Sequence, residues 1–501
     1  MQPHRGRSAA RATMVIMWAI AALAIVASLG LAEPAQAVPS FARQTGQPCG
    51  TCHTDFPALT PFGRSFKLRG YTAGGGPFRR TPFDFDYGAA AELLAQYTGM
   101  PVKAPPAIIG STNDIWVPPV AVMAVVGFTH TQAPQDPTGS SYSPNDNVFP
   151  SPVSAFYGGA ITDHLGALAQ LTWSGPGFGL PPDPFTHVWG WDNTNVRYSD
   201  TGRLGGVDFV WGITADNNPT VQDVWNSTPA WRFPFASSTL ALTPAAKTII
   251  DGTLGPGHVA GVGAYAWIND LVYLEGTGYK GLGFTTQNNL GEDPLGAPGL
   301  LKPSPYFRIA VEPHWGNNSL EVGAFGLFAN IAPWLFPLDG SHNASPITDK
   351  YSDIGVDTQY QYQGDYYWVT LRGSYIHESR RLDASTLLFG TNPNDNLNTF
   401  RGEASLAYGG DNRIIGTGQY FATWGSFDPV QFAGSQLTGI PNSNGFVFEL
   451  AYMPFGMSKA PLWPWFSARI GAQYTYYNEF DGDSVHAHDH NTFFLYAWLA
   501  M

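Results

Sequence analysis

Cysteine is nearly absent from this chain, basic residues are scarce, and no long apolar run follows the N-terminal region. The 501 residues include only two cysteines, Cys49 and Cys52. Lys and Arg number 25 against 38 Asp and Glu, so the sequence has no basic patch for nucleic acid. After residue 37 no apolar segment is long enough for a membrane helix. With 14% aromatic residues, the chain is also unlike a disordered segment.

The N-terminal region, residues 1–37, has the organisation of a signal peptide. Three arginines precede an apolar run over residues 14–32, and Ala35-Gln36-Ala37 then places small residues at the −3 and −1 positions of a cleavage site. An uncleaved membrane anchor is the alternative, because the run is nearly long enough to cross a bilayer. Both interpretations place the two cysteines outside the cytoplasm.

These cysteines form a Cys-x-x-Cys-His motif with His53. Outside the cytoplasm, a Cys-x-x-Cys pair can be a disulfide, a thioredoxin-type redox site, half a zinc site or a haem anchor. Zinc needs about four ligands and no second cysteine pair exists, while the Pro- and Gly-rich flanks do not offer the βαβ unit of a thioredoxin-type site. The motif therefore predicts one haem c, with thioether bonds from Cys49 and Cys52 and with His53 as an axial ligand of the haem iron.

The haem-binding segment, predicted over residues 38–82, is too short to enclose a haem by itself. The remainder of the chain must therefore complete the haem pocket.

The sequence does not identify the sixth ligand of the haem iron as clearly as it identifies Cys49, Cys52 and His53. No Met or His follows His53 within the haem-binding segment, so this ligand comes from Lys67 or from later in the chain. Met123 is the leading candidate, because it lies in the first predicted strand and a thioether is a common partner of histidine in c-type haems. Met100, His130 and Lys67 stay open, and a packing or lipid-facing role for Met123 is the alternative.

Apolar and polar residues alternate with period two from residue 119 to the C-terminus. Within residues 352–363, for example, Ile354 and Val356 share one face while Asp353 and Asp357 share the other. Sixteen such segments are predicted as strands: 119–130, 153–161, 166–174, 186–198, 205–214, 257–268, 271–279, 304–315, 319–330, 352–363, 366–377, 397–409, 413–425, 444–453, 466–477 and 490–501. A soluble sandwich would show the same alternation, so the connections must distinguish the two folds.

Tight turns and longer loops mostly alternate along these strands, and the last strand is rich in aromatic residues. An even number of strands with short turns at one end and long loops at the other is typical of an outer-membrane barrel. The sequence therefore predicts an all-β fold: a 16-stranded outer-membrane β-barrel over residues 119–501, surrounded by outer-membrane lipid. Residues 83–118 are predicted as a linker or insertion. The haem-binding segment starts on the periplasmic side and is of a size to enter the lumen as a plug.

Residues 38–72 (VPSFARQTGQPCGTCHTDFPALTPFGRSFKLRGYT) resemble the N-terminal signature of the outer-membrane fused monohaem cytochrome–porins. The family's best-known members are iron oxidases of Fe(II)-oxidising bacteria. Residues 156–166 (FYGGAITDHLG) and 217–231 (NNPTVQDVWNSTPAW) are also similar to segments of such proteins. The resemblance implies extracellular electron uptake, in which an extracellular electron donor reduces the haem and a periplasmic electron-carrier cytochrome accepts the electron.

The function expected from these features is electron transfer across the outer membrane, with Fe(II) oxidation as one form of it. A haem fixed within a pore allows a donor that cannot enter the cell to be used. Two alternatives are a transport porin whose haem plug is structural or sensory, and a haem enzyme that acts on a small molecule. A porin is expected to pass ions or sugars, whereas an electron conduit is expected to pass electrons with little leak.

Three further expectations concern the barrel interior and its rim. The loop that carries Trp225 and Trp231 is long enough to fold inward, although a packed loop without a ligand role is the simpler interpretation. His486, His488 and His490 precede the last strand and, if its alternation extends back to them, form an extracellular site for Fe(II), because imidazole and carboxylate suit such metals. A polar loop that binds metal only adventitiously is the alternative. Mixed charges are expected to face the lumen: Glu321, Asp353, Asp357, Arg372, Arg401, Glu403 and Arg469.

Overall fold

The computed structural model describes residues 39–72, 119–135, 143–173, 189–292, 299–335, 343–409, 414–432, 438–455, 457 and 463–501. The predicted signal peptide (residues 1–37), the predicted linker or insertion (residues 83–118) and Met100 lie outside these residues.

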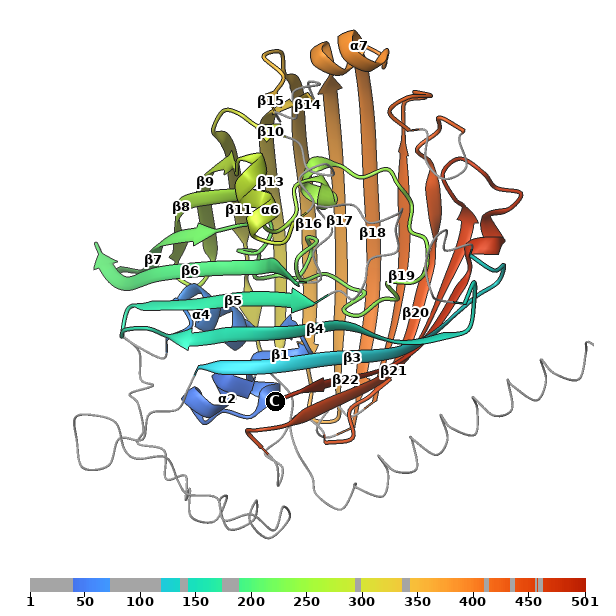
Figure 1. Ribbon diagram of the computed structural model, residues 1–501. Coiled ribbons are helices and arrows are strands. Elements are labelled where there is room, and N and C mark those ends of the chain that lie inside the picture. The colour runs from blue at the N-terminus through green and yellow to red at the C-terminus, as the bar shows by residue number, and fades with distance from the viewer. Residues whose placement is uncertain are drawn as a thin grey trace, which may run out of the picture.

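One antiparallel sheet closes on itself to form a barrel (Figure 1). Two of its eighteen strands, β10 (Gly299–Leu300) and β12 (His314–Trp315), are two-residue pieces that pair with β13 beside β11. The other sixteen form the wall, which the pairing of β11 with β9 closes. These are β3 (Val120–Thr131), β4 (Asn147–Ala160), β5 (Leu165–Trp173), β6 (Trp189–Leu204), β7 (Val207–Asp216), β8 (Val259–Ile268), β9 (Val272–Gly281), β11 (Ser304–Val311), β13 (Asn318–Ala332), β16 (Asp349–Gln363), β17 (Tyr367–Arg381), β18 (Asn394–Tyr408), β19 (Ile414–Gly425), β20 (Ser443–Tyr452), β21 (Ser467–Glu479) and β22 (Thr492–Ala500).

The prediction of a 16-stranded barrel is confirmed, with differences at some strand ends. The strand predicted over residues 304–315 is divided between β11 and β12, and β4 begins earlier than residue 153. The prediction that the last strand begins at residue 490 is wrong, because η2 (Ala487–His490), a 3₁₀ helix, precedes β22.

The alternation along each strand separates a polar lumen from an apolar exterior. In β16, Asp353 and Asp357 are 0% and 4% exposed, whereas Ile354 and Val356 are 44% and 50% exposed. All seven charged residues expected in the lumen are inside the barrel, with Arg401 only partly buried. A closed barrel with an apolar exterior leaves no unpaired sheet edge in lipid, and this architecture places the protein in the outer membrane. Within the described residues, none of the helices is long and apolar enough to cross a membrane.

Long connections lie at one end of the barrel, and tight turns lie at the other except for residues 453–466 between β20 and β21. At the long-loop end, α6 (Phe284–Asn289) follows β9, the hairpin of β14 (Trp334–Leu335) and β15 (Asn343–Ala344) follows β13, and α7 (Asp383–Phe389) follows β17. Gly205-Gly206, both with positive φ, make one of the tight turns, a conformation that glycine adopts without a steric cost.

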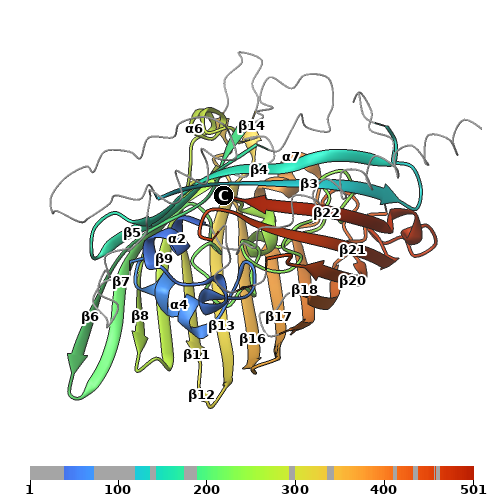
Figure 2. The same ribbon diagram turned by 90° about the horizontal axis from the view of Figure 1, so that it is seen from below.

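The N-terminal segment, residues 39–72, lies inside the barrel at the short-turn end (Figure 2). This segment is called the plug from here on. It consists of α2 (Pro39–Thr45), α3 (Cys49–Cys52), a small hairpin of β1 (His53–Asp55) and β2 (Ala58–Leu59), and α4 (Pro61–Leu68).

The connection between β7 and β8, residues 217–258, folds into the lumen instead of standing above the barrel. Figure 1 shows this green chain crossing the interior in front of the orange strands. Gln419 and Gln473 donate hydrogen bonds to the backbone carbonyls of Phe233 and Ala236, both at about mid-loop. The connection is called the inward loop, and it contains the short π-helical turn η1 (Ile249–Thr253).

Candidate functional site

The plug folds locally around the turn that carries the two cysteines. Thr60 caps α4 by accepting a hydrogen bond from the Gly63 amide at 3.0 Å, and Pro61 occupies the first helical position, where its missing N–H costs nothing. The Thr60 amide donates to the Cys52 carbonyl at 2.9 Å, which holds α4 against α3. A Cβ at Gly63 would lie 2.2 Å from that carbonyl oxygen, so only glycine permits this approach.

A cavity of about 280 Å³ lies between the plug, the barrel wall and the inward loop. Its lining is mostly apolar and aromatic. The plug contributes Phe41, Ala42, Thr45, Gln47, Pro48, Cys49, Cys52, His53, Phe56, Pro57, Leu59, Gly63, Phe66, Lys67 and Tyr71; the wall contributes Met123, Pro152, Phe156, Leu168, Gln170, Asn193 and Trp498; and the loop contributes Asn226, Ala230, Trp231 and Phe235. The structure therefore brings Cys49, Cys52, His53 and Met123 to one cavity.

His53 is held in a fixed orientation at this cavity. Its Nδ1 lies 3.2 Å from the carbonyl oxygen of Pro57, and its ring packs edge-on against Phe56, which in turn packs against Trp498. Burial lowers the pKa of His53 to about 4, so the imidazole is neutral at pH 7. A neutral imidazole whose Nδ1–H donates to a backbone carbonyl leaves Nε2 as a metal ligand.

The two cysteines mark the ends of the single-turn helix α3. Cys49 packs among Met453, Met457 and other apolar side chains. Burial raises the pKa of the Cys52 thiol to about 12, because the thiolate is removed from water. Two thiols beside a neutral imidazole form a donor set that matches covalent haem attachment in residue type and spacing.

Two buried arginines fasten the plug to the barrel wall. Arg469 of β21 forms a salt bridge with Asp55 and donates to the Phe56 carbonyl at 3.1 Å, while its guanidinium also bonds Glu449. On the other side, Arg64 of α4 pairs with Glu312 and donates to Gln361 at 2.9 Å. The alternation had indicated that Arg469 faces the lumen, but its partner Asp55 lies more than four hundred residues away and was not predicted.

The candidates for the sixth ligand differ in their surroundings. Met123 lies on the lumen face of β3 and lines the cavity. Lys67 also lines it, but its Nζ donates to the carbonyls of Val221 and Asp223 at 2.6 and 2.8 Å. Burial, together with a nearby arginine, holds the pKa of Lys67 well below its usual range. His130 is exposed, with Nδ1 2.7 Å from Asp146, and does not line the cavity.

The inward loop closes one side of the cavity through Trp231, one of its two tryptophans. Trp231 lines the cavity and packs its ring against the Lys67 ammonium, 4.9 Å away. Trp225 is fully buried, and its indole N–H donates to Glu312 at 2.7 Å. Asn226 joins loop to plug, because its Oδ1 accepts a hydrogen bond from the Leu59 amide at 3.0 Å.

The extracellular Fe(II) site expected at His486, His488 and His490 is not formed. His486 pairs with Asp483 at 2.9 Å, and the exposed His488 lies 3.4 Å from Asp489. His490 is instead buried and stacked on a phenylalanine ring, 3.9 Å between centroids. The expected alternation fails here because residues 487–490 form η2 instead of a strand, with His486 at its N-cap. Across the described ranges, no group of three or more His, Cys, Asp or Glu side chains is arranged to hold a metal ion.

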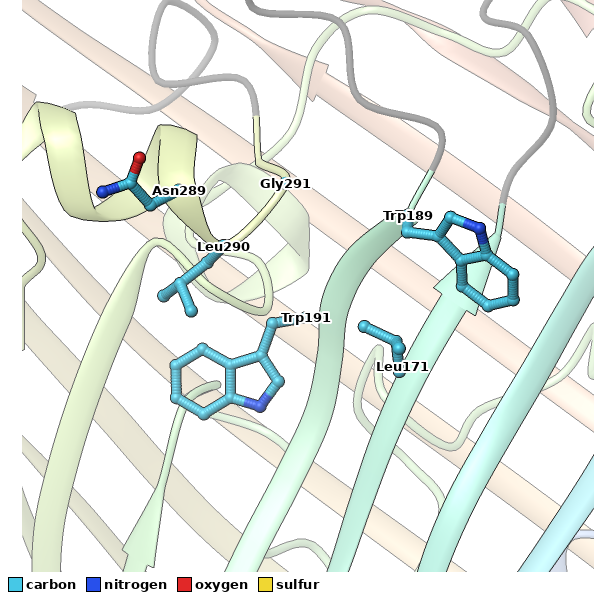
Figure 3. Close-up of a pocket in the computed structure, with 6 residues that line it drawn as sticks. All are labelled: Leu171, Trp189, Trp191, Asn289, Leu290 and Gly291. Carbon is cyan, nitrogen blue, oxygen red and sulfur yellow. The ribbon is translucent and has the colours of Figure 1, made fainter.

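A second, shallower pocket lies at the long-loop end of β5 and β6 (Figure 3). Trp189, Trp191 and Leu171 of these strands form one part of it, and Asn289, Leu290 and Gly291 form the rest. Leu171 pairs across the sheet with Trp191 and belongs to the outward face. Aromatic residues at this position are expected of a barrel's interface with lipid headgroups, and the pocket shares no lining residue with the cavity at the plug.

The chain is similar in overall fold to solved outer-membrane proteins. Pseudomonas putida OprB is 10% identical with a TM-score of 0.43, over 76% of this chain and 92% of that one. The outer membrane channel DcaP of Acinetobacter baumannii is 13% identical with a TM-score of 0.39, over 76% and 96%. OmpT of Vibrio cholerae is 9% identical with a TM-score of 0.37, over 76% and 96%. No protein-family model matches the chain, and no curated protein matches it.

Proposed function

We propose that this outer-membrane barrel is an electron-transfer protein with one haem c attached in the plug cavity. An extracellular donor, with Fe(II) as the leading candidate, supplies the electrons, and a periplasmic cytochrome accepts them. The observation that carries the proposal is the meeting of two thiols and a neutral imidazole on the wall of one apolar cavity within a membrane-spanning barrel.

Each group in the cavity has a role in holding the haem. Cys49 and Cys52 provide the thioether bonds, and His53, oriented by the Pro57 carbonyl, provides the first axial nitrogen. Met123 is proposed as the sixth ligand, because it is the one methionine among the residues that line this described cavity. When bound, the haem supplies a one-electron redox centre.

The protein around the cavity keeps this centre fixed and shielded from water. Aromatic side chains from the plug, the wall and the inward loop surround the space, which lowers the local dielectric and limits solvent access. The salt bridges of Arg469 and Arg64 hold the plug from two sides, so the cavity keeps its position relative to the wall.

A transport porin whose haem plug is structural or sensory is the alternative. The described lumen does not favour it, because the plug and the inward loop both occupy the interior and form ion pairs with the barrel there. Proteoliposomes discriminate between the two functions. Vesicles that contain an electron conduit are expected to leak ions and sugars only slowly, whereas vesicles that contain a porin are expected to pass them freely.

Haem attachment is tested by expression in cells that mature c-type cytochromes, followed by denaturing electrophoresis and haem staining. The wild-type band is expected to stain, and Cys49→Ser/Cys52→Ser is expected not to. Ser65→Ala is the matched control, because Ser65 lies on the plug but outside the cavity lining, and it is expected to stain like the wild type. Staining of the double variant at wild-type intensity would reject the attachment site.

Donor use is tested separately on the purified haem-loaded protein. Fe(II) is expected to reduce the haem at a rate that rises with pH, because Fe(II) becomes a stronger reductant as Fe(III) hydrolyses. Full reduction by dithionite with no reduction by Fe(II) at any pH would exclude Fe(II) as the donor while leaving the haem assignment intact.

A further inference from the structure

Two acidic residues face each other on adjacent strands deep in the lumen. Asp353 of β16 and Glu378 of β17 are direct cross-strand partners, and both are 0% exposed. Side chains in this position have Cβ atoms roughly 5 Å apart, and two like charges there destabilise the sheet. Both carboxyl groups therefore cannot be ionised without a compensating group close by.

The pair holds the tip of the inward loop. The amide of Ile249 donates to Glu378 Oε2 at 2.7 Å, and the amide of Ile250 donates to Asp353 Oδ2 at 2.9 Å. Arg380 pairs with Glu378 Oε1 and also donates to the Lys247 carbonyl at 3.0 Å. Lys247, Ile249 and Ile250 of the inward loop are thus hydrogen-bonded to β16 and β17 through this one cluster.

One carboxyl oxygen of the pair has weaker hydrogen bonding than the others. Asp353 Oδ1 is buried and accepts no hydrogen bond of good geometry among the described residues, although the Thr248 hydroxyl lies close to the Asp353 carboxyl group. Leaving a buried acceptor unsatisfied costs about 1–3 kcal/mol, and more when the group is charged. A proton on this oxygen would remove the charge and turn the acceptor into a donor.

The charges that face the cluster do not neutralise it. Arg380 pairs with Glu378 and supplies one positive charge beside two carboxyl groups. The other titratable or charged groups packed around the cluster are Tyr351 and Asp349 of β16, Asp395 of β18, and Lys247 and Asp251 of the inward loop. Asp349 is bonded to the amides of α7, and Asp251 is bonded to Arg232 and Arg401.

We propose that the Asp353 carboxyl group, which faces Glu378, is protonated in the folded protein, and that this proton keeps the tip of the inward loop on the barrel wall. The inference does not depend on the haem. At alkaline pH the proton passes to hydroxide, the Asp353 carboxylate is repelled by Glu378, and its displaced side chain moves away from the amide of Ile250. The loop tip then detaches and the lumen widens.

The proton on Asp353 is tested directly by infrared spectroscopy of the purified protein. The carbonyl stretch of a protonated carboxyl group is expected at neutral pH and is expected to disappear reversibly at alkaline pH. Asp353→Asn, which keeps the shape and supplies an N–H toward Glu378, is expected to lack this band. Asp208→Asn, at an exposed ion pair on the rim, is the control and is expected to keep it. A band of equal intensity in Asp353→Asn would reject the assignment.

The attachment of the loop tip to the barrel wall is tested by amide exchange at Ile249 and Ile250. In the wild type, the protection factor is expected to be constant near neutral pH and to fall by up to about tenfold per pH unit above the midpoint of the infrared titration, since one proton is released. In Asp353→Asn, it is expected to stay constant across the same range. If Asp353→Asn fails to fold, the wild-type protein still tests the proposal. A protection factor that does not change with pH through the infrared midpoint would contradict attachment of the loop tip by this proton.

Discussion

Replacement of Arg469 by methionine is predicted to loosen the plug. Arg469 is 1% exposed and forms the salt bridge with Asp55 that joins plug to wall, while Glu449 and the Tyr496 hydroxyl also bond its guanidinium. Methionine keeps much of the side-chain volume but leaves two carboxyl groups without their cation. Glu449 keeps its hydrogen bond from Gln473 at 2.9 Å, so Asp55 is the group that loses most.

The size of the expected effect follows from the burial of the Arg469–Asp55 ion pair. Removing one partner of a buried ion pair costs about 3–5 kcal/mol, because the remaining charge is left uncompensated. If that cost falls on the docking of the plug, the docking equilibrium weakens roughly 150- to 5,000-fold. Amide exchange in α4 reports this equilibrium, because the amides of Gly63 and Arg64 are bonded within the docked plug.

Exchange in Arg469→Met is therefore expected to accelerate within that range at neutral pH. The matched control is Arg203→Met, which breaks an ion pair with Asp208 in which both side chains are 71% exposed and is expected to change exchange little. The double variant Arg469→Met/Asp55→Asn is expected to recover part of the protection, since it removes the uncompensated charge. Equal exchange in wild type and Arg469→Met, with the barrel intact, would refute the reasoning about the anchor.

Three other predictions concern separate parts of the chain. Met123→Leu is expected to lower the midpoint potential of the haem and to change its absorption spectrum, because a thioether ligand raises the potential; an unchanged spectrum and potential would remove Met123 as the ligand. Glu292, whose pKa burial raises to about 8, is expected to contribute stability that is complete below about pH 4.5 and lost as pH rises through about 8; Glu292→Gln is expected to flatten the pH dependence of unfolding in that window, and parallel curves would contradict this. Replacing His486, His488 and His490 together by Ala is expected to leave the rate of haem reduction by Fe(II) unchanged, and a clear slowing would show that the loop binds the donor after all.

The alternation of residue types was sufficient to predict the wall of the barrel. In β16, each polar residue that the pattern assigned to the lumen, such as Asp353 or Asp357, is buried there, because a period of two leaves no other face. The aromatic face of the last strand also turned inward, with Trp498 against the plug. These features depend on neighbouring residues in the sequence, which is why they are readable from it.

Features that depend on distant or competing contacts were not predictable in this way. The inward loop is held by pairs such as Asp251 with Arg401, whose separation along the chain carries no local signal. At the rim, Asp483 accepts hydrogen bonds from the amides of Val485 and His486, and such local bonds compete with strand pairing and favour the turn into η2. The Cys-x-x-Cys-His motif identified three plug residues of the cavity. It did not identify the wall and loop residues that complete the lining.

Electron transfer across a sealed membrane tests the proposed function most directly. Proteoliposomes would contain the haem-loaded protein with its long loops outward, a soluble c-type cytochrome inside, and an Fe(II) chelate that cannot cross the bilayer outside. The account predicts that the internal cytochrome is reduced, while vesicles with the Cys49→Ser/Cys52→Ser barrel show neither reduction nor greater leak. Equal rates with the two barrels, or no reduction by the correctly oriented haem-loaded protein, would contradict it.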